Sequence, residues 1–156
     1  MSDADSRICF SDSSFGKTPY PYGGAATIDN GAAVSFFSRK PKFVVPDSSC
    51  YAELNVIVQA LKEAIFVNHI YEDMFGVSKK IVIITDNKAA YDIIKNPGVT
   101  KHSVHFERWI YFARNAYLHG RAKFVLTTDA NMMADSLTKV TDRTKFYACR
   151  SYLMNA

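Results

Sequence analysis

Cysteine, glycine and proline are scarce in this sequence, and their scarcity excludes several structural classes. The 156 residues contain three cysteines, seven glycines and five prolines. Cys9, Cys50 and Cys149 are odd in number, lie far apart and form no CxxC pair, which excludes a disulfide framework and a cysteine-rich zinc site. We therefore expect three free thiols in a reducing compartment. The low glycine content also excludes a collagen-like chain.

Long apolar runs and histidine clusters are missing as well. The most apolar stretch, residues 56–70, is interrupted by Lys62, Glu63 and His69, so the sequence predicts no membrane-spanning helix. The first seven residues are acidic and polar, unlike a signal peptide. His102 and His105 are three residues apart, but no third ligand is evident, so a zinc site is not expected.

The hydrophobic and charged fractions of the chain are those of a folded domain. Hydrophobic residues make up 48% of the chain and charged residues 22%. A chain of this length buries a core without disulfide or metal support. We expect one domain over residues 1–156, with a core at about 7–140 and a helical extension at 141–156. The net charge of +4 permits a polyanionic partner but does not require one.

Local patterns predict a mixed α/β fold. The predicted strands are 7–14, 25–29, 32–38, 81–84 and 121–127, and the predicted helices are 47–75, 88–95, 101–119, 131–139 and 142–153. Asn30-Gly31 is typical of a type I′ hairpin turn, and residues 15–24 are predicted to form a loop. The unbroken run Ile81–Ile84 indicates a parallel strand buried on both faces. This order predicts a mixed five-stranded sheet with helices on both faces.

Four acidic residues stand at special places in this scheme. Asp12 and Asp86 lie at the ends of predicted strands, Glu53 in the first turn of the long helix, and Asp135 in the short helix after the last strand. Crowded carboxylates are stabilised by hard divalent cations. Two such ions about 4 Å apart can promote phosphodiester hydrolysis. Each residue alone is equally consistent with a helix cap or a solvated surface position, so both interpretations stay open.

Six short blocks, in order over about residues 8–140, resemble a known family. The blocks are FSDSSFG, SRKPK, SSCYAE, TDNKAA, TKH and ADSLTK. Together they are similar to the ribonuclease H domains of copia-type (Pseudoviridae) LTR retrotransposon Pol polyproteins. The resemblance implies a ribonuclease H-like fold and endonucleolytic hydrolysis of the RNA strand of RNA–DNA hybrids during reverse transcription.

The resemblance also implies a metal centre. Asp12, Glu53, Asp86 and Asp135 match the family's four acidic residues and would hold two Mg²⁺ ions, with Mn²⁺ as a substitute. Asp12 would bridge both ions, Glu53 and Asp86 would hold one, and Asp135 would complete the other. The family further implies the reverse transcriptase domain of the same polyprotein as a partner, and a cytoplasmic location within virus-like particles.

Two alternatives remain at this point. One is a catalytically inactive nucleic-acid-binding module that keeps the fold, and the other is a different nuclease of the same superfold, such as an integrase or resolvase. The four intact acidic positions argue against the first, and the ADSLTK block argues against the second.

Nucleic-acid contacts are predicted on two segments. Lys101, His105 and Arg108 fall at i, i+4 and i+7 of a predicted helix and so share one stripe, which we expect to follow hybrid phosphates. Lys17, Tyr20 and Tyr22 lie in the loop predicted at 15–24 and are a second set of candidates for contacts with nucleic acid.

Overall fold

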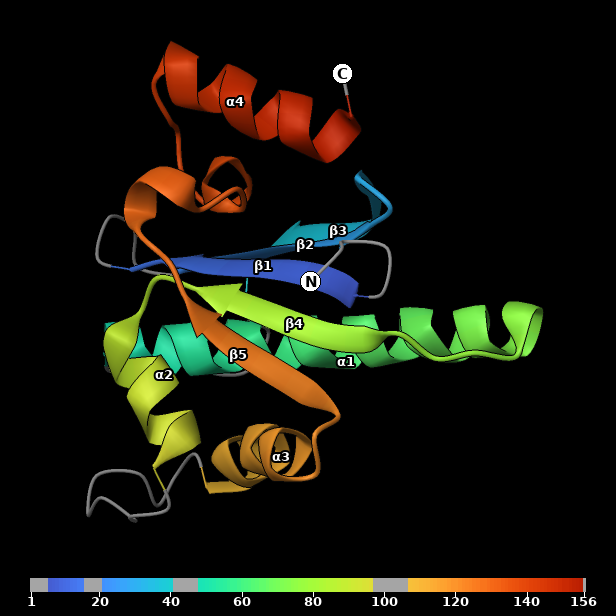
Figure 1. Ribbon diagram of the computed structural model, residues 1–156. Coiled ribbons are helices and arrows are strands. Elements are labelled where there is room, and N and C mark those ends of the chain that lie inside the picture. The colour runs from blue at the N-terminus through green and yellow to red at the C-terminus, as the bar shows by residue number, and fades with distance from the viewer. Residues whose placement is uncertain (1–5, 16–20, 41–47, 97–106, 156) are drawn as a thin grey trace.

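The fold is described by a computed structural model that places residues 6–15, 21–40, 48–96 and 107–155 (Figure 1). The elements in chain order are β1 (Ser6–Ser14), β2 (Tyr22–Asp29), β3 (Ala32–Arg39), α1 (Ser49–Phe75), β4 (Lys80–Thr85), α2 (Lys88–Lys95), α3 (Glu107–Leu118), β5 (Ala122–Leu126), η3 (Asp129–Asn131), η4 (Asp135–Leu137) and α4 (Arg143–Met154).

The five strands form one mixed sheet in the order β3-β2-β1-β4-β5. The pairs β1–β2 and β2–β3 are antiparallel, whereas β1–β4 and β4–β5 are parallel. Helices α1, α2 and α3 lie on one side of the sheet and α4 lies on the other (Figure 1). The predicted α/β architecture with helices on both faces is therefore confirmed.

Residues with special backbone preferences fix the ends of several elements. Asn30 and Gly31 have φ angles of 50° and 82°, which confirms the type I′ turn between β2 and β3. The Ser48 hydroxyl accepts a hydrogen bond from the Tyr51 amide and so caps the start of α1. The helix ends at Gly76, whose φ of 69° is the left-handed conformation that glycine tolerates.

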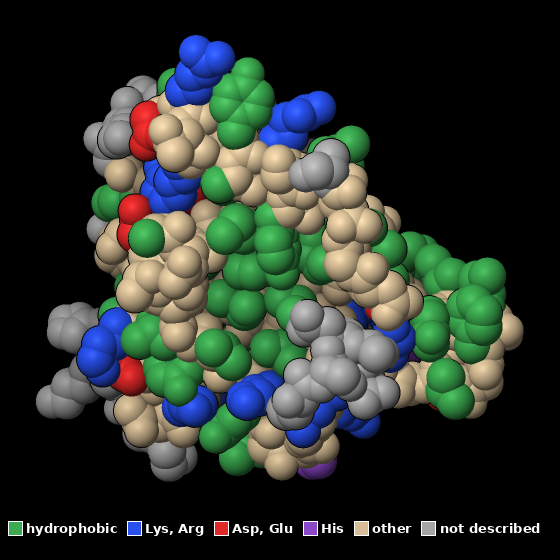
Figure 2. Space-filling view, turned by 45° about the horizontal axis from the view of Figure 1, so that its top comes forward, with side chains coloured by type: hydrophobic (Ala, Val, Ile, Leu, Met, Phe, Trp, Pro, Cys, Tyr) green, Lys and Arg blue, Asp and Glu red, His purple; other side chains and the backbone are tan. Residues whose placement is uncertain are grey.

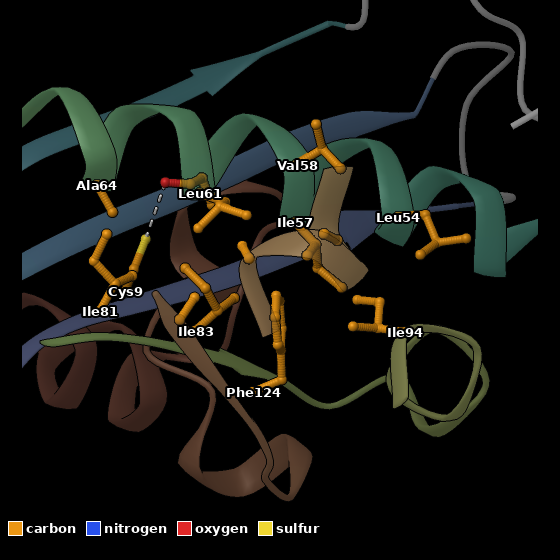
Figure 3. Close-up of a cluster of buried hydrophobic side chains, with 14 of the residues drawn as sticks. Cys9, Leu54, Ile57, Val58, Leu61, Ala64, Ile81, Ile83, Ile94 and Phe124 are labelled. Atoms are coloured by element: carbon orange, nitrogen blue, oxygen red, sulfur yellow. Dashed lines mark hydrogen bonds between the residues drawn. The ribbon is translucent and has the colours of Figure 1, made fainter. Parts of the chain in front are cut away.

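The main core lies between α1 and the sheet (Figure 3). Leu54, Ile57 and Leu61 project from one side of α1 and are fully buried against strand residues such as Ile83 and Phe124. A smaller cluster lies on the opposite face of the sheet and consists of Phe10, Ala26, Ile28, Met132 and Ala134. The three cysteines are free, as predicted.

The prediction that β4 is buried on both faces is only half right. Ile81 and Ile83 are buried, but Val82 and Ile84 are partly exposed. Because α4 packs against β3 and η4, the second face of β4 is only partly covered. Figure 2 shows apolar side chains gathered in the hollow beside α4 on this side of the molecule.

Two predicted segments are wrong in detail. The loop predicted at 15–24 overlaps β2, because Tyr22, Gly23 and Gly24 pair with β1. The helix predicted at 131–139 is instead the two short turns η3 and η4. Met132 separates them with an extended backbone (φ −80°, ψ 101°), which places its side chain in the smaller core. The predicted helix 101–119 is described only from residue 107 onward.

Candidate metal centre

The parallel pairing of β1 and β4 brings Asp12 and Asp86 to one edge of the sheet. Phe10 pairs with Ile84, and each aspartate lies two residues further along its strand direction. Glu53 faces them from the second turn of α1 and not from its first turn as predicted, because the helix begins at Ser49, directly after the Ser48 cap. One oxygen from each of Asp12, Glu53 and Asp86 lies within 4.8 Å of the other two. The structure thus gathers three of the four predicted residues.

Asp135 joins this cluster through a second group of carboxylates. Single oxygens of Asp86, Asp129 and Asp135 also lie within 4.8 Å of one another. Asp86 belongs to both groups, whereas the resemblance assigned the shared position to Asp12. The prediction did not include Asp129, although it follows the end of β5, a parallel strand beside β4. Its place near the carboxyl end of a parallel strand is the signal that would have found it.

A close contact between β2 and η4 holds Asp135 in place. An added Cβ at Gly24 would lie 2.7 Å from Leu137 Cβ and 2.8 Å from Thr138 Cγ2, so only glycine allows this approach. The Thr138 hydroxyl donates a hydrogen bond to the Asp12 carboxylate and lies 3.1 Å from the Asp135 carbonyl oxygen. Residues 126 positions apart in the sequence are connected in this way.

Burial makes the carboxylates of this cluster hard to ionise. Asp12 is 2% exposed and Glu53 is 3% exposed. Burial raises the pKa of Asp12 to about 6, against the opposing hydrogen bond from Thr138. Burial, with the charges of Asp12 and Asp86, raises the pKa of Glu53 well above its ordinary value. Burial and the Asp135 carboxylate likewise raise the pKa of Asp86.

One carboxylate oxygen in the first group lacks a hydrogen bond. Glu53 Oε1 accepts a hydrogen bond from the Ser13 amide at 2.7 Å. Glu53 Oε2 is buried and has no hydrogen-bond partner among the described residues. An orphaned buried oxygen beside two further carboxylates, all of them hard ligands, fits a divalent cation such as Mg²⁺. Asp12, Glu53 and Asp86 therefore have the composition of a metal site.

Two lysines balance the charge of the second group. Lys139 Nζ lies 3.0 Å from Asp135 Oδ1 and 3.4 Å from Asp129 Oδ1. Lys145 of α4 forms ion pairs with Asp135 and Asp129. Burial lowers the pKa of Lys145, but its hydrogen bonds to Asp135 and Asp129 outweigh this effect, so the net pKa is raised. The hydrogen bond from Lys145 correspondingly lowers the pKa of Asp129.

The predicted nucleic-acid contacts are mostly beyond what the structure describes. Lys17, Lys101 and His105 lie outside the described residues, while Arg108 is an exposed residue of α3. The basic stripe therefore stays a prediction. In the described part of the chain, no helix has both the length and the apolar character needed to span a membrane.

The sequence of the chain is similar to part of a retrovirus-related polyprotein. No family model matches the chain. The chain is 26% identical over 121 residues to the retrovirus-related Pol polyprotein from transposon TNT 1-94 of Nicotiana tabacum. This match spans 78% of the chain but only 9% of the relative's length.

Solved structures with a similar fold include ribonuclease H domains. The N-terminal RNase H domain of a Mycobacterium tuberculosis protein has a TM-score of 0.65 at 13% identity, covering 94% of this chain and 96% of that one. RNase H1 from Halobacterium salinarum has a TM-score of 0.62 at 15% identity, with coverages of 85% and 94%. A foamy viral protease-reverse transcriptase in complex with an RNA/DNA hybrid has a TM-score of 0.63 at 14% identity, covering 87% of this chain and 20% of that one.

These comparisons fit a ribonuclease H domain of a Pol polyprotein. The chain has the ribonuclease H fold, as the sequence blocks predicted.

Proposed function

We propose that this chain is a metal-dependent ribonuclease H that hydrolyses the RNA strand of RNA–DNA hybrids. The observation that carries the proposal is the carboxylate group of buried Asp12, buried Glu53 and half-buried Asp86, with one Glu53 oxygen lacking a partner among the described residues. The ribonuclease H fold and the similarity to a transposon Pol polyprotein support it. The expected cofactor is a pair of Mg²⁺ ions, for which Mn²⁺ substitutes.

The acidic residues of the centre form two sets of ligands in this proposal. Asp12, Glu53 and Asp86 would hold one cation, and Asp86, Asp129 and Asp135 would hold the other. Divalent cations, when bound, supply charge stabilisation for an in-line phosphodiester displacement. The Ser13 amide fixes the orientation of Glu53. Burial of Asp12 and Glu53 lowers the local dielectric and would so strengthen their attraction for a divalent cation.

The proposed substrate and partners follow from the similar proteins. One structural neighbour is a protease-reverse transcriptase in complex with an RNA/DNA hybrid. We therefore assign an RNA–DNA hybrid as the substrate, with the 2′-hydroxyl distinguishing its RNA strand. We also assign the reverse transcriptase domain of the same polyprotein as a partner and cytoplasmic virus-like particles as the location. In this proposal residues 1–156 act as one domain.

A cleavage assay with matched variants tests the activity. Labelled hybrid, single-stranded RNA and duplex DNA are incubated with the chain and Mg²⁺, and we expect cleavage of the hybrid's RNA strand alone. Glu53→Gln removes a charge of the site and should lower the rate by at least about a hundredfold, since a lost metal contact costs several kcal/mol. Glu72→Gln, the same change at an exposed position of α1, is the control and should leave the rate unchanged.

The outcomes separate the proposal from its two alternatives. Hybrid binding without cleavage under any metal condition would identify an inactive binding module. Cleavage of duplex DNA would identify another nuclease of the superfold. Glu53→Gln with the activity of Glu72→Gln would show that the metal site is misassigned.

A further inference from the structure

Lys145, a residue of α4, reaches the acidic cluster of the sheet edge. Its ammonium donates a hydrogen bond to the Asp129 backbone carbonyl at 2.6 Å and lies 3.3 Å from Asp129 Oδ2. It also pairs with Asp135 Oδ2. Figure 2 shows basic and acidic side chains side by side at the end of the molecule where α4 begins. The C-terminal helix thus contributes a positive charge to the cluster.

The contacts of Asp135 show what this charge does. The Asp135 side chain is fully buried, and each of its two oxygens pairs with a lysine ammonium, Oδ1 with Lys139 and Oδ2 with Lys145. Only the ammonium groups of Lys139 and Lys145 lie against these oxygens in the described part of the chain. A buried carboxylate without a countercharge is strongly destabilising. The lysines therefore supply the positive charge that a second divalent cation would otherwise supply.

We propose that Lys145 is a cationic placeholder that competes with the second divalent cation for Asp135 and Asp129. This inference rests on the proposed function, because it concerns the second of the two proposed ions. The group of Asp12, Glu53 and Asp86 holds no lysine at such distances among the described residues. The first ion therefore binds without this competition, and the two ions bind with different affinities.

The anchoring of α4 allows Lys145 to be displaced without unfolding the helix. Asp142 caps α4 by accepting a hydrogen bond from the Lys145 amide at 2.9 Å. The far half of the helix is held by Cys149, which is buried, and by Tyr152, whose ring packs on Phe10 with centroids 5.5 Å apart. The Lys145 side chain can therefore leave Asp135 while the rest of α4 stays docked.

Calorimetric titration of the full chain with Mn²⁺ tests this inference. The wild type should bind two ions in two phases, a tighter and a weaker one. Lys145→Gln removes the competing ammonium and should tighten the weaker phase by about tenfold or more, since a hydrogen bond between charged groups is worth about that factor. Lys145→Arg keeps the charge and should bind like the wild type. Lys123→Gln, a charge loss at an exposed position of β5, controls for net charge.

The possible results separate this inference from the proposed function. If the wild type and Lys145→Gln both bind two Mn²⁺ ions, and the weaker phase has the same affinity in both proteins, the placeholder role alone is overturned. Weaker binding by Lys145→Gln would also overturn it, because Lys145 would then support the site. A wild type that binds no Mn²⁺ would overturn the metal-dependent function and this inference with it.

A measurement on the wild type covers the case in which Lys145→Gln does not fold. The ¹³Cε resonance of Lys145 is followed during a Mg²⁺ titration of lysine-labelled protein. We expect it to stay in place during the first binding phase and to move during the second. A resonance that does not move in either phase would overturn the inference.

Discussion

Replacing Asp12 with Asn should stabilise the metal-free protein at neutral pH. Asp12 is 2% exposed, and burial raises its pKa from an ordinary value of 3.8 to about 6. A shift of about two pKa units corresponds to about 3 kcal/mol at 1.36 kcal/mol per unit. Asparagine removes the charge and keeps an oxygen that accepts the Thr138 hydrogen bond. We expect a gain in the free energy of unfolding of about 1–3 kcal/mol.

The pH dependence gives this prediction its sign. The folded-state pKa of Asp12 lies above the unfolded value, so the folded chain binds the proton more tightly. Ionisation of Asp12 therefore lowers the free energy of unfolding. This loss develops as the pH rises from about 4 through about 6. The advantage of Asp12→Asn should be present at pH 7 and should disappear near pH 4.

Urea denaturation in the presence of EDTA measures the effect at both pH values. The exposed residue Asp73 gives the control Asp73→Asn, which should change stability little. Adding Mg²⁺ should stabilise the wild type more than Asp12→Asn, because a ligand that binds only the native state raises its stability and the variant has lost one ligand of the first site. The reasoning is refuted if Asp12→Asn is less stable than the wild type at pH 7 in EDTA, or if its gain is the same at pH 4.

Three further predictions concern the metal centre and the substrate. Mg²⁺ binding near pH 6 should release protons, because the pKa values of Asp12, Glu53 and Asp86 are raised; calorimetry in two buffers of different ionisation enthalpy should give different apparent enthalpies, and equal ones would contradict this. Gly24→Ala should lower the free energy of unfolding in urea by about 1–3 kcal/mol and weaken Mn²⁺ binding, because the added methyl group displaces η4. An unchanged free energy of unfolding would mean that the close contact is easily relieved. Lys101→Ala with Arg108→Ala should lower the salt slope of hybrid binding by about 0.7–0.9 for each lost phosphate contact, and a wild-type slope would place the hybrid on another surface.

Local sequence patterns determined most of the secondary structure of this protein. Helix caps, the Asn30-Gly31 turn and the apolar spacing of α1 depend on residues a few positions apart, so they can be read directly from the chain. The same applies to the position of Asp86 after a β-branched strand. The family blocks added the choice of four acidic residues, because they place each one in a recognised motif.

Only the tertiary structure decided how the acidic residues combine. The register of β1 against β4 brings Asp12 and Asp86 together, and no local pattern encodes that register. The sharing of Asp86 between two groups and the inclusion of Asp129 depend on where η3 and η4 pack.

The lysine contacts also required the fold. Lys145 is ten residues from Asp135 in the sequence and belongs to a different helix, so no helical spacing predicts their ion pair. The close approach of η4 to Gly24 is equally invisible in the sequence, since it joins segments more than a hundred residues apart. Local interactions chose the elements of this protein, whereas packing between distant elements decided which charges meet.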